Sequence, residues 1–238
     1  MKLRALLVVA GAAALRVPVA PLRAPASRAR PPTASALSTV GAGLLATSGT
    51  VWWVAPKWGV EKLGQPADEW RGETAVAMMR VAAAWQMCLA AVLFVGQKGP
   101  TLAAGYGLIA AGLTNLAVVP TWETLGRPKG SMVGGSVLFF ALGYGTLLGK
   151  VSPYVAAGIY SVLGALIYFT PIATSKLYEV KKPFSDAAHA LLALGGGMML
   201  TTGLFLGGLT KGWLSGSGQS VAAILVLLEL KVLASLKK

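Results

Sequence analysis

Seven apolar stretches, most of them long enough to cross a lipid bilayer, fill residues 37–238 of the chain. A membrane-spanning helix needs about 20 consecutive apolar residues, within a range of roughly 17–25. We therefore predict an all-α, polytopic transmembrane helix bundle with spans at about 38–55, 74–96, 101–119, 132–149, 154–173, 187–209 and 219–236. The composition agrees with this class, because 12% of the residues are charged, about half the share that is usual in a soluble domain.

The last three spans look like a second copy of the first three. Segment 52–66 aligns with 168–183, and in both segments aromatic residues precede a proline and a later Lys-Leu pair. Segment 87–99 aligns with 198–212, and both end on Lys-Gly, at a common offset of about 111–115 residues. The copies are four spans apart, so they would share one orientation. This predicts a parallel 3+1+3 repeat, with a four-span unit at 37–150 and a three-span unit at 151–238. The layout is similar in topology to the sugar-efflux type of small transporter.

Residues 1–36 have the composition of a cleavable leader. A basic start is followed by an apolar segment at 6–14, as in a signal peptide. A basic tract rich in Ser and Pro comes next, and the first acidic residue of the chain is Glu61. This order resembles the bipartite presequence of algae with complex plastids, although Leu15 stands where such leaders often have Phe. The resemblance implies a plastid envelope or thylakoid membrane. The alternative is a mitochondrial presequence and the mitochondrial inner membrane.

The loops between the spans carry their cations asymmetrically. Loops 57–73, 120–131 and 174–186 and the C-terminus hold ten Lys or Arg residues, against three in the loops of the opposite face. Positive loops face the side from which insertion occurs, so we predict the C-terminus on the stromal side. The net charge of +13 therefore reflects targeting and topology, and we expect no nucleic-acid partner.

The rarest reactive residues argue against catalysis. Cys88 is the single cysteine and His189 the single histidine, and no P-loop or G-x-G-x-x-G sequence is present. We predict that the protein is not an enzyme, with no metal and no cofactor. The layout of residues 52–80, in which a span, a proline and a short loop precede an arginine, faintly resembles DoxX-like membrane proteins, which implies no defined chemistry.

Ionisable and amide groups inside the spans are the best functional candidates, because such groups are costly in hydrocarbon. The candidates are Arg80, Asn115, His189 and Glu229, all placed in the same half of the bilayer by the predicted spans. We predict an Arg80–Glu229 ion pair across the repeat interface, with Glu73 as the rival partner. The alternative is that Arg80 reaches the basic face and Glu229 pairs with a nearby lysine.

Small residues four apart predict close helix contacts. They are Ala141, Gly145 and Gly149; Ala157, Ser161 and Ala165; and Gly203 and Gly207. Three consecutive glycines at 195–197 predict either tight packing or a loosened helix at bilayer depth.

Three functions fit these features. The first is a carrier or channel for a small solute, in which the polar candidates line the path. The second is a structural or assembly subunit, with the lipid bilayer, other membrane subunits or a second copy of the chain as partners. The third is pigment or lipid binding, although no repeated E-x-x-x-R sequence of the light-harvesting type occurs.

Overall fold

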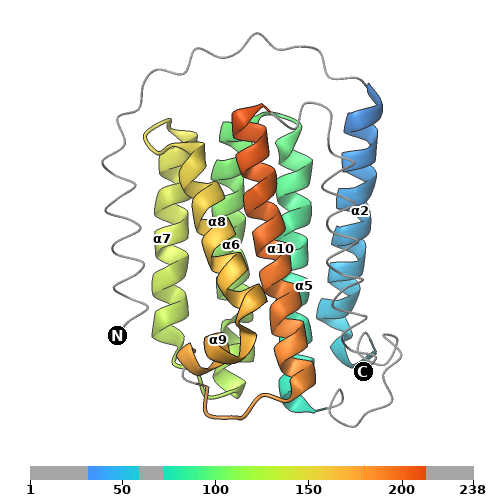
Figure 1. The fold of residues 1–238 in the computed structure, drawn as a ribbon, viewed down its shortest axis with the longest axis vertical. Helices are drawn as coiled ribbons and strands as arrows, with labels where there is room; N and C mark the ends of the chain where they lie inside the picture. The colour runs from blue at the N-terminus through green and yellow to red at the C-terminus, as the bar shows by residue number, and fades with distance from the viewer. Residues whose placement is uncertain (1–31, 59–71, 179, 213–238) are drawn as a thin grey trace.

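The computed structural model describes residues 32–58, 72–178 and 180–212. All regular structure in these ranges is helical (Figure 1), which confirms the predicted all-α class. The helices are α2 (Pro32–Val54), α5 (Glu73–Gly96), α6 (Pro100–Thr124), α7 (Lys129–Leu147), α8 (Pro153–Phe169), α9 (Pro171–Leu177) and α10 (Asp186–Lys211).

Four of these helices, α5, α6, α7 and α10, are long and apolar enough to cross a membrane, and the bent pair of α8 and α9 would make a fifth. The predicted span at 38–55 is helical within α2 (Pro32–Val54), but α2 is not among the helices that qualify as candidate spans. The predicted span at 219–236 lies outside the described residues, so the count of seven and the internal repeat stay predictions. Large apolar side chains such as Val137, Val162 and Leu113 are more than half exposed. An apolar exterior of this kind fits a lipid-facing surface.

The helices alternate in direction and form a bundle with α5 and α10 side by side near its middle (Figure 1). Helix α2 packs on α5, and α8 packs on α10. Helix α6 packs on both α5 and α7, whereas α7 and α8 hardly touch. The bundle therefore holds two closely packed pairs, α6–α7 and α8–α10, that meet loosely along α7 and α8.

The predicted span at 154–173 is helical but broken, because helix α8 ends at Phe169 and the chain turns by 108° into α9. Thr170 has φ −130° and ψ 54°, outside the helical region. A residue before a proline is pushed away from the α conformation, and Pro171 then begins α9 without needing an amide donor. The apolar run continues through the bend, which is why hydropathy alone did not reveal it.

The contact of α8 with α10 depends on glycines. A methyl group added at Gly196 would lie 2.6 Å from the Tyr168 backbone nitrogen, and one at Gly203 would collide with Ser161. The small residues at 157–165 and at 203 were each predicted to lie on a close helix contact, and the structure confirms this by packing Gly203 against Ser161. Gly196 packs tightly within an unbroken helix. This agrees with tight packing, the first of the two alternatives predicted for the glycines at 195–197.

The contact of α6 with α7 also depends on glycines, but on a different face of α7 from the predicted one. A methyl group added at Gly143 would lie 2.8 Å from the Gly105 carbonyl oxygen. Ala141 is exposed, and Gly149 ends the helix with φ +71°. The prediction of a seam through Ala141, Gly145 and Gly149 is wrong, because small residues recur on several faces of this helix and the partner helix selects one.

Two loops meet at the end of the bundle where α5 begins. The Lys181 amide donates to the Leu125 carbonyl oxygen at 3.1 Å. The Lys182 ammonium pairs with the Glu73 carboxylate at 2.7 Å. The first contact holds the loop after α6 against the loop that precedes α10, and the second ties that loop to the start of α5.

Candidate binding cavity

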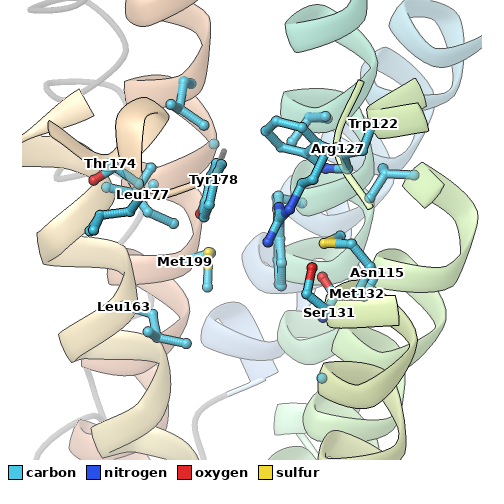
Figure 2. A pocket seen from close by; sticks show the side chains of 18 of the residues that line it. Asn115, Trp122, Arg127, Ser131, Met132, Leu163, Thr174, Leu177, Tyr178 and Met199 are labelled. Carbon is cyan, nitrogen blue, oxygen red and sulfur yellow. The ribbon is translucent and has the colours of Figure 1, made fainter. Parts of the chain in front are cut away.

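A cavity of about 450 Å³ lies between the α6–α7 pair and the α8–α10 pair. Its walls are mostly apolar side chains and glycines, with polar groups concentrated near the loops (Figure 2). The apolar and glycine walls include Val81, Trp85, Val118, Gly134, Gly135, Leu138, Phe139, Leu163, Leu166, Ile167, Leu192, Gly195, Gly196 and Met199. Ligand sites in proteins typically measure about 300–1,000 Å³ and have such walls with few polar groups.

The cavity is open along α7. Gly130, Ser131, Gly134 and Leu138 line it and are also exposed. A methyl group added at Gly134 would meet nothing within 4 Å, so this stretch of α7 leaves space that a larger side chain would fill. The opening lies where α7 and α8 hardly touch, at the apolar exterior of the bundle.

Arg127 marks the polar end of the cavity. Its guanidinium carbon lies 4.2 Å from the centre of the Tyr178 ring and 5.0 Å from the centre of the Trp122 ring. The two rings also touch each other edge to face, with centroids 5.1 Å apart. Figure 2 shows Arg127 and Trp122 on one side of the cavity and Tyr178 on the other. A cation–π contact of this type stabilises by about 0.5–2 kcal/mol, so the two rings hold the guanidinium in place.

The local backbone explains how Arg127 reaches this position. Helix α6 ends at Thr124, and the Arg127 amide then donates to the Trp122 carbonyl oxygen at 3.0 Å. Gly126 has φ +85°, a conformation that side chains other than glycine rarely adopt. A methyl group added there would also lie 2.8 Å from the Lys181 Cβ. Glycine at 126 thus allows both the turn and the close approach of the second loop.

The charge at this end is positive. Burial raises the pKa of the Tyr178 phenol, and the nearby Arg127 charge opposes this rise. The ring is therefore neutral at pH 7, and Arg127 remains charged because arginine does not deprotonate in proteins. Arg127 is the single charged side chain among the described residues that line the cavity. Lys176 and Lys181 are exposed on the adjacent elements.

Three polar uncharged side chains, Asn115, Ser131 and Thr174, also line the cavity. The Ser131 hydroxyl donates to the Pro128 carbonyl oxygen at 3.2 Å, and the Thr174 hydroxyl to that of Leu166 at 3.4 Å. The Asn115 amide lines the cavity and makes no hydrogen bond to another described side chain or backbone group. Asn115 therefore offers both donors and an acceptor to a bound molecule.

Helix α9 forms part of the wall near this end, through Thr174 and Leu177. It is tied to α10 by a hydrogen bond of 3.0 Å between the Ser175 hydroxyl and the His189 Nε2 atom. His189 Nδ1 is buried and has no partner among the described residues. Because α9 is short and follows the bend at Thr170, this bond helps to fix the wall of the cavity.

The structure brings one of the four predicted site residues into the cavity, namely Asn115. His189 lies behind the wall, where it holds α9. Arg80 precedes the cavity residue Val81 on α5, but its side chain is exposed and does not line the cavity. Glu229 lies outside the described residues, so the Arg80–Glu229 pair stays a prediction. The rival partner Glu73 pairs with Lys182 instead.

The sequence did not reveal the group formed by Trp122, Arg127 and Tyr178. Trp122 fitted the aromatic belt of a membrane interface, and Arg127 counted among the basic loop residues. A signal was present, because each of the two basic loops carries aromatic residues beside its cations. Their meeting depends on the bend at Thr170, which hydropathy did not show.

Comparisons of the chain with protein-family models, with curated proteins and with solved structures find no match.

Proposed function

We propose that the chain is a multi-pass membrane protein that binds a small, largely apolar molecule and carries it within the membrane. The main support for this proposal is the cavity of about 450 Å³, whose apolar walls and polar end match a molecule with an apolar body and a polar end. The opening along α7 lies at the apolar exterior, so the molecule enters sideways from the lipid. This combines the expected carrier function with the expected binding of a lipid or pigment.

The packing of the bundle supports movement between the two pairs of helices. Each pair is joined closely at glycines, as at Gly143 in α6–α7 and Gly196 in α8–α10. The contact between the pairs along α7 and α8 is slight. Carriers expose a site by rocking one unit against another. Here such a movement would leave both glycine contacts intact, but it would have to break the hydrogen bond of 2.6 Å from the Tyr160 hydroxyl on α8 to the Gly107 carbonyl oxygen on α6.

Quenching of Trp85 tests this function, because Trp85 lines the cavity and is 8% exposed. The full chain is placed in bilayer nanodiscs with a stearate that is brominated at mid-chain, since bromine quenches indole fluorescence on contact. The quenching of Trp85 is obtained by subtracting the fluorescence of Trp85→Phe from that of the wild type at each concentration of brominated stearate. We expect the quenching of Trp85 to saturate and to be reversed by unbrominated stearate.

Two glycine variants make the test specific. Gly134→Phe fills the cavity, whereas Gly158→Phe adds the same ring at an exposed position of α8 outside it. At both positions an added methyl group meets nothing within 4 Å, so neither change forces the backbone apart. We expect Gly134→Phe to abolish the reversible quenching and Gly158→Phe to preserve it. Equal quenching in both variants and in the wild type would refute binding in the cavity.

We further propose that the protein resides in a plastid membrane with its basic loops on the stromal side. Support comes from the composition of residues 1–36 and from the cationic loops, which include Arg127, Lys129, Lys181 and Lys182. A fluorescent protein fused after residue 36 should enter the plastid of an alga with complex plastids. Accumulation in mitochondria would overturn this location and leave the binding function untouched.

A further inference from the structure

We infer that the molecule held in the cavity is an uncharged single-chain amphiphile, drawn from the bilayer, whose polar end forms a hydrogen bond with the Asn115 amide. This inference rests on the proposed function and names the class of molecule that the same cavity takes. The size of the cavity, the state of its polar groups and its opening toward the lipid each narrow the choice.

The size of the cavity favours one hydrocarbon chain. A methylene group is similar in size to a water molecule, whose share of liquid volume is about 30 Å³. The cavity of about 450 Å³ therefore holds about 15 such groups by this measure. That is close to one long aliphatic chain, whereas the two chains of a membrane phospholipid need about twice the space.

Asn115 differs from the other uncharged polar side chains of the cavity. The Ser131 hydroxyl already donates to the Pro128 carbonyl oxygen, and the Thr174 hydroxyl to that of Leu166. The Asn115 amide lines the same cavity and makes no hydrogen bond to another side chain or backbone group in the part of the chain that the structure describes. Its two donors and its acceptor therefore remain for a bound molecule.

Glycines of α7 leave the Asn115 amide uncovered. A methyl group added at Gly135 would lie 3.6 Å from the Asn115 Nδ2 atom, which is an ordinary contact distance. A side chain at position 135 would thus cover the amide, whereas glycine leaves it bare. Gly134, beside it, lines the opening of the cavity, and Figure 2 shows Asn115 near Ser131 on the same side of the cavity. A polar group that enters along α7 therefore reaches the amide close to the opening.

The charge at the polar end is already engaged. The Arg127 guanidinium lies against the rings of Trp122 and Tyr178, and Arg127 makes a further interaction besides these two contacts. An anionic head would have to displace interactions that Arg127 already makes, and a cationic head would be repelled by its charge. Lys176 and Lys181 are exposed and do not line the cavity. An uncharged head requires no change in any of these groups.

The route of entry also favours an uncharged head. The cavity opens along α7 at the apolar exterior, where Val137 and Leu138 are exposed. A charged group is costly in hydrocarbon, whereas uncharged polar groups in lipid are satisfied by hydrogen bonds with amides and hydroxyls of neighbouring helices. The chain of the molecule is apolar in the bilayer and in the cavity alike. The bond to Asn115 must therefore supply much of the preference for the cavity.

The competition form of the Trp85 assay tests this inference. Stearyl alcohol, stearamide, octadecyl sulfate, stearylamine and octadecane share one chain and differ in the head. Each competes against the brominated stearate in wild-type nanodiscs. We expect the alcohol and the amide to compete about fivefold better than octadecane, which corresponds to about 1 kcal/mol for one hydrogen bond between uncharged groups. The sulfate and the amine should compete less well than the alcohol.

Two variants assign the preference to Asn115. Asn115→Leu keeps a side chain of similar size without the amide, and should bring the alcohol to the strength of octadecane. Ser131→Ala is the matched control, because Ser131 also lines the cavity but its hydroxyl already donates to Pro128. This control should keep the fivefold difference. The order of the heads in the wild type decides the charge of the head even if Asn115→Leu does not fold.

The outcomes separate the two proposals. Equal competition by the alcohol and octadecane, or stronger competition by the sulfate or the amine, with reversible quenching intact, overturns the uncharged head and leaves the cavity as a binding site. A fivefold difference that persists in folded Asn115→Leu overturns the assignment to Asn115. Absence of reversible quenching with every probe, or its persistence in Gly134→Phe, refutes the proposed function itself.

Discussion

Replacing Gly164 with alanine tests the closest helix contact of the bundle. Gly164 lies on α8 and faces α10, where an added methyl group would collide with the backbone nitrogen of Leu200. It would also lie 2.6 Å from the Leu200 Cα and 2.8 Å from the Gly196 carbonyl oxygen. All three neighbours are backbone atoms, so no side chain can turn away. The two helices must separate, and the wall of the cavity that α8 provides must move with them.

The expected loss of stability follows from two opposing terms. Alanine favours a helix over glycine by about 1 kcal/mol. Overpacking typically costs about 1–3 kcal/mol, and three contacts below 3 Å with backbone atoms place Gly164→Ala at the upper end. The net loss is therefore about 2 kcal/mol. Each kcal/mol moves the unfolding midpoint of a domain of this size by roughly 2–4 °C, so we expect a fall of about 4–8 °C.

Cys88 provides the assay, because it is the single cysteine of the chain and is 3% exposed. A thiol-reactive fluorescent reagent reports the temperature at which heating makes it accessible. Gly134→Ala is the control, since its added methyl group meets nothing within 4 Å and the helix preference should raise the midpoint slightly. If Gly164→Ala were as stable as Gly134→Ala, the close approach of α8 and α10 would be refuted.

Three further perturbations have expected outcomes. Tyr160→Phe removes the donor to the buried Gly107 carbonyl oxygen at 2.6 Å, and should destabilise by about 1–3 kcal/mol in thermal unfolding followed by circular dichroism. Lys182→Gln should shift the same midpoint by less than about 1 kcal/mol, because the side chains of its pair with Glu73 are 45% and 61% exposed. Burial raises the pKa of Tyr178, so its contribution is present below the ordinary tyrosine pKa of about 10 and is lost as pH rises through the higher folded value. Wild-type midpoints should therefore fall more than those of Tyr178→Phe between pH 9 and 11, and parallel curves would contradict this.

The sequence predicted the long helices well. The predicted spans at 74–96 and 187–209 differ by at most two residues at each end from α5 (Glu73–Gly96) and α10 (Asp186–Lys211). A run of about 20 apolar residues is a strong signal, because backbone groups in lipid must bond within the segment. The bend at Thr170 was missed, since it interrupts the backbone without interrupting the apolar run.

Helix contacts were predicted in part. The small residues Ser161 and Gly203 do face each other, whereas α7 uses Gly143 in place of the predicted Ala141 and Gly145. Small residues at intervals of four mark a possible contact face, but a glycine-rich helix has several such faces. The neighbouring helix decides which face is used, and that information is absent from the helix's own sequence.

The candidate site was the least predictable part. Asn115 was identified from its depth in a predicted span, and it lines the cavity. Arg127 and Tyr178 are 51 positions apart in the chain and meet through the bend of α8 into α9 and the contact of two loops. Arg80 satisfied the same criterion as Asn115, yet its side chain is exposed. Depth within a span selects candidates, but the direction in which a side chain points requires the packing of the bundle.

Glycine has two opposite roles in this bundle, and the cavity depends on both. At Gly143, Gly164 and Gly196 an added methyl group would lie within 2.8 Å of neighbouring atoms, so the missing side chain lets two helices approach closely. At Gly134 the same missing side chain leaves space, because no partner helix fills it. Tight contacts within α6–α7 and α8–α10 keep the walls in place, while space along α7 keeps the cavity open. Substitutions at the first group should therefore lower stability, and large substitutions at Gly134 should block binding without unfolding the protein. If substitutions at Gly134 and at the close-contact glycines changed only stability, the space between α7 and α8 would be a packing defect. If Gly134 variants lost binding and kept their stability, that space would be a binding site.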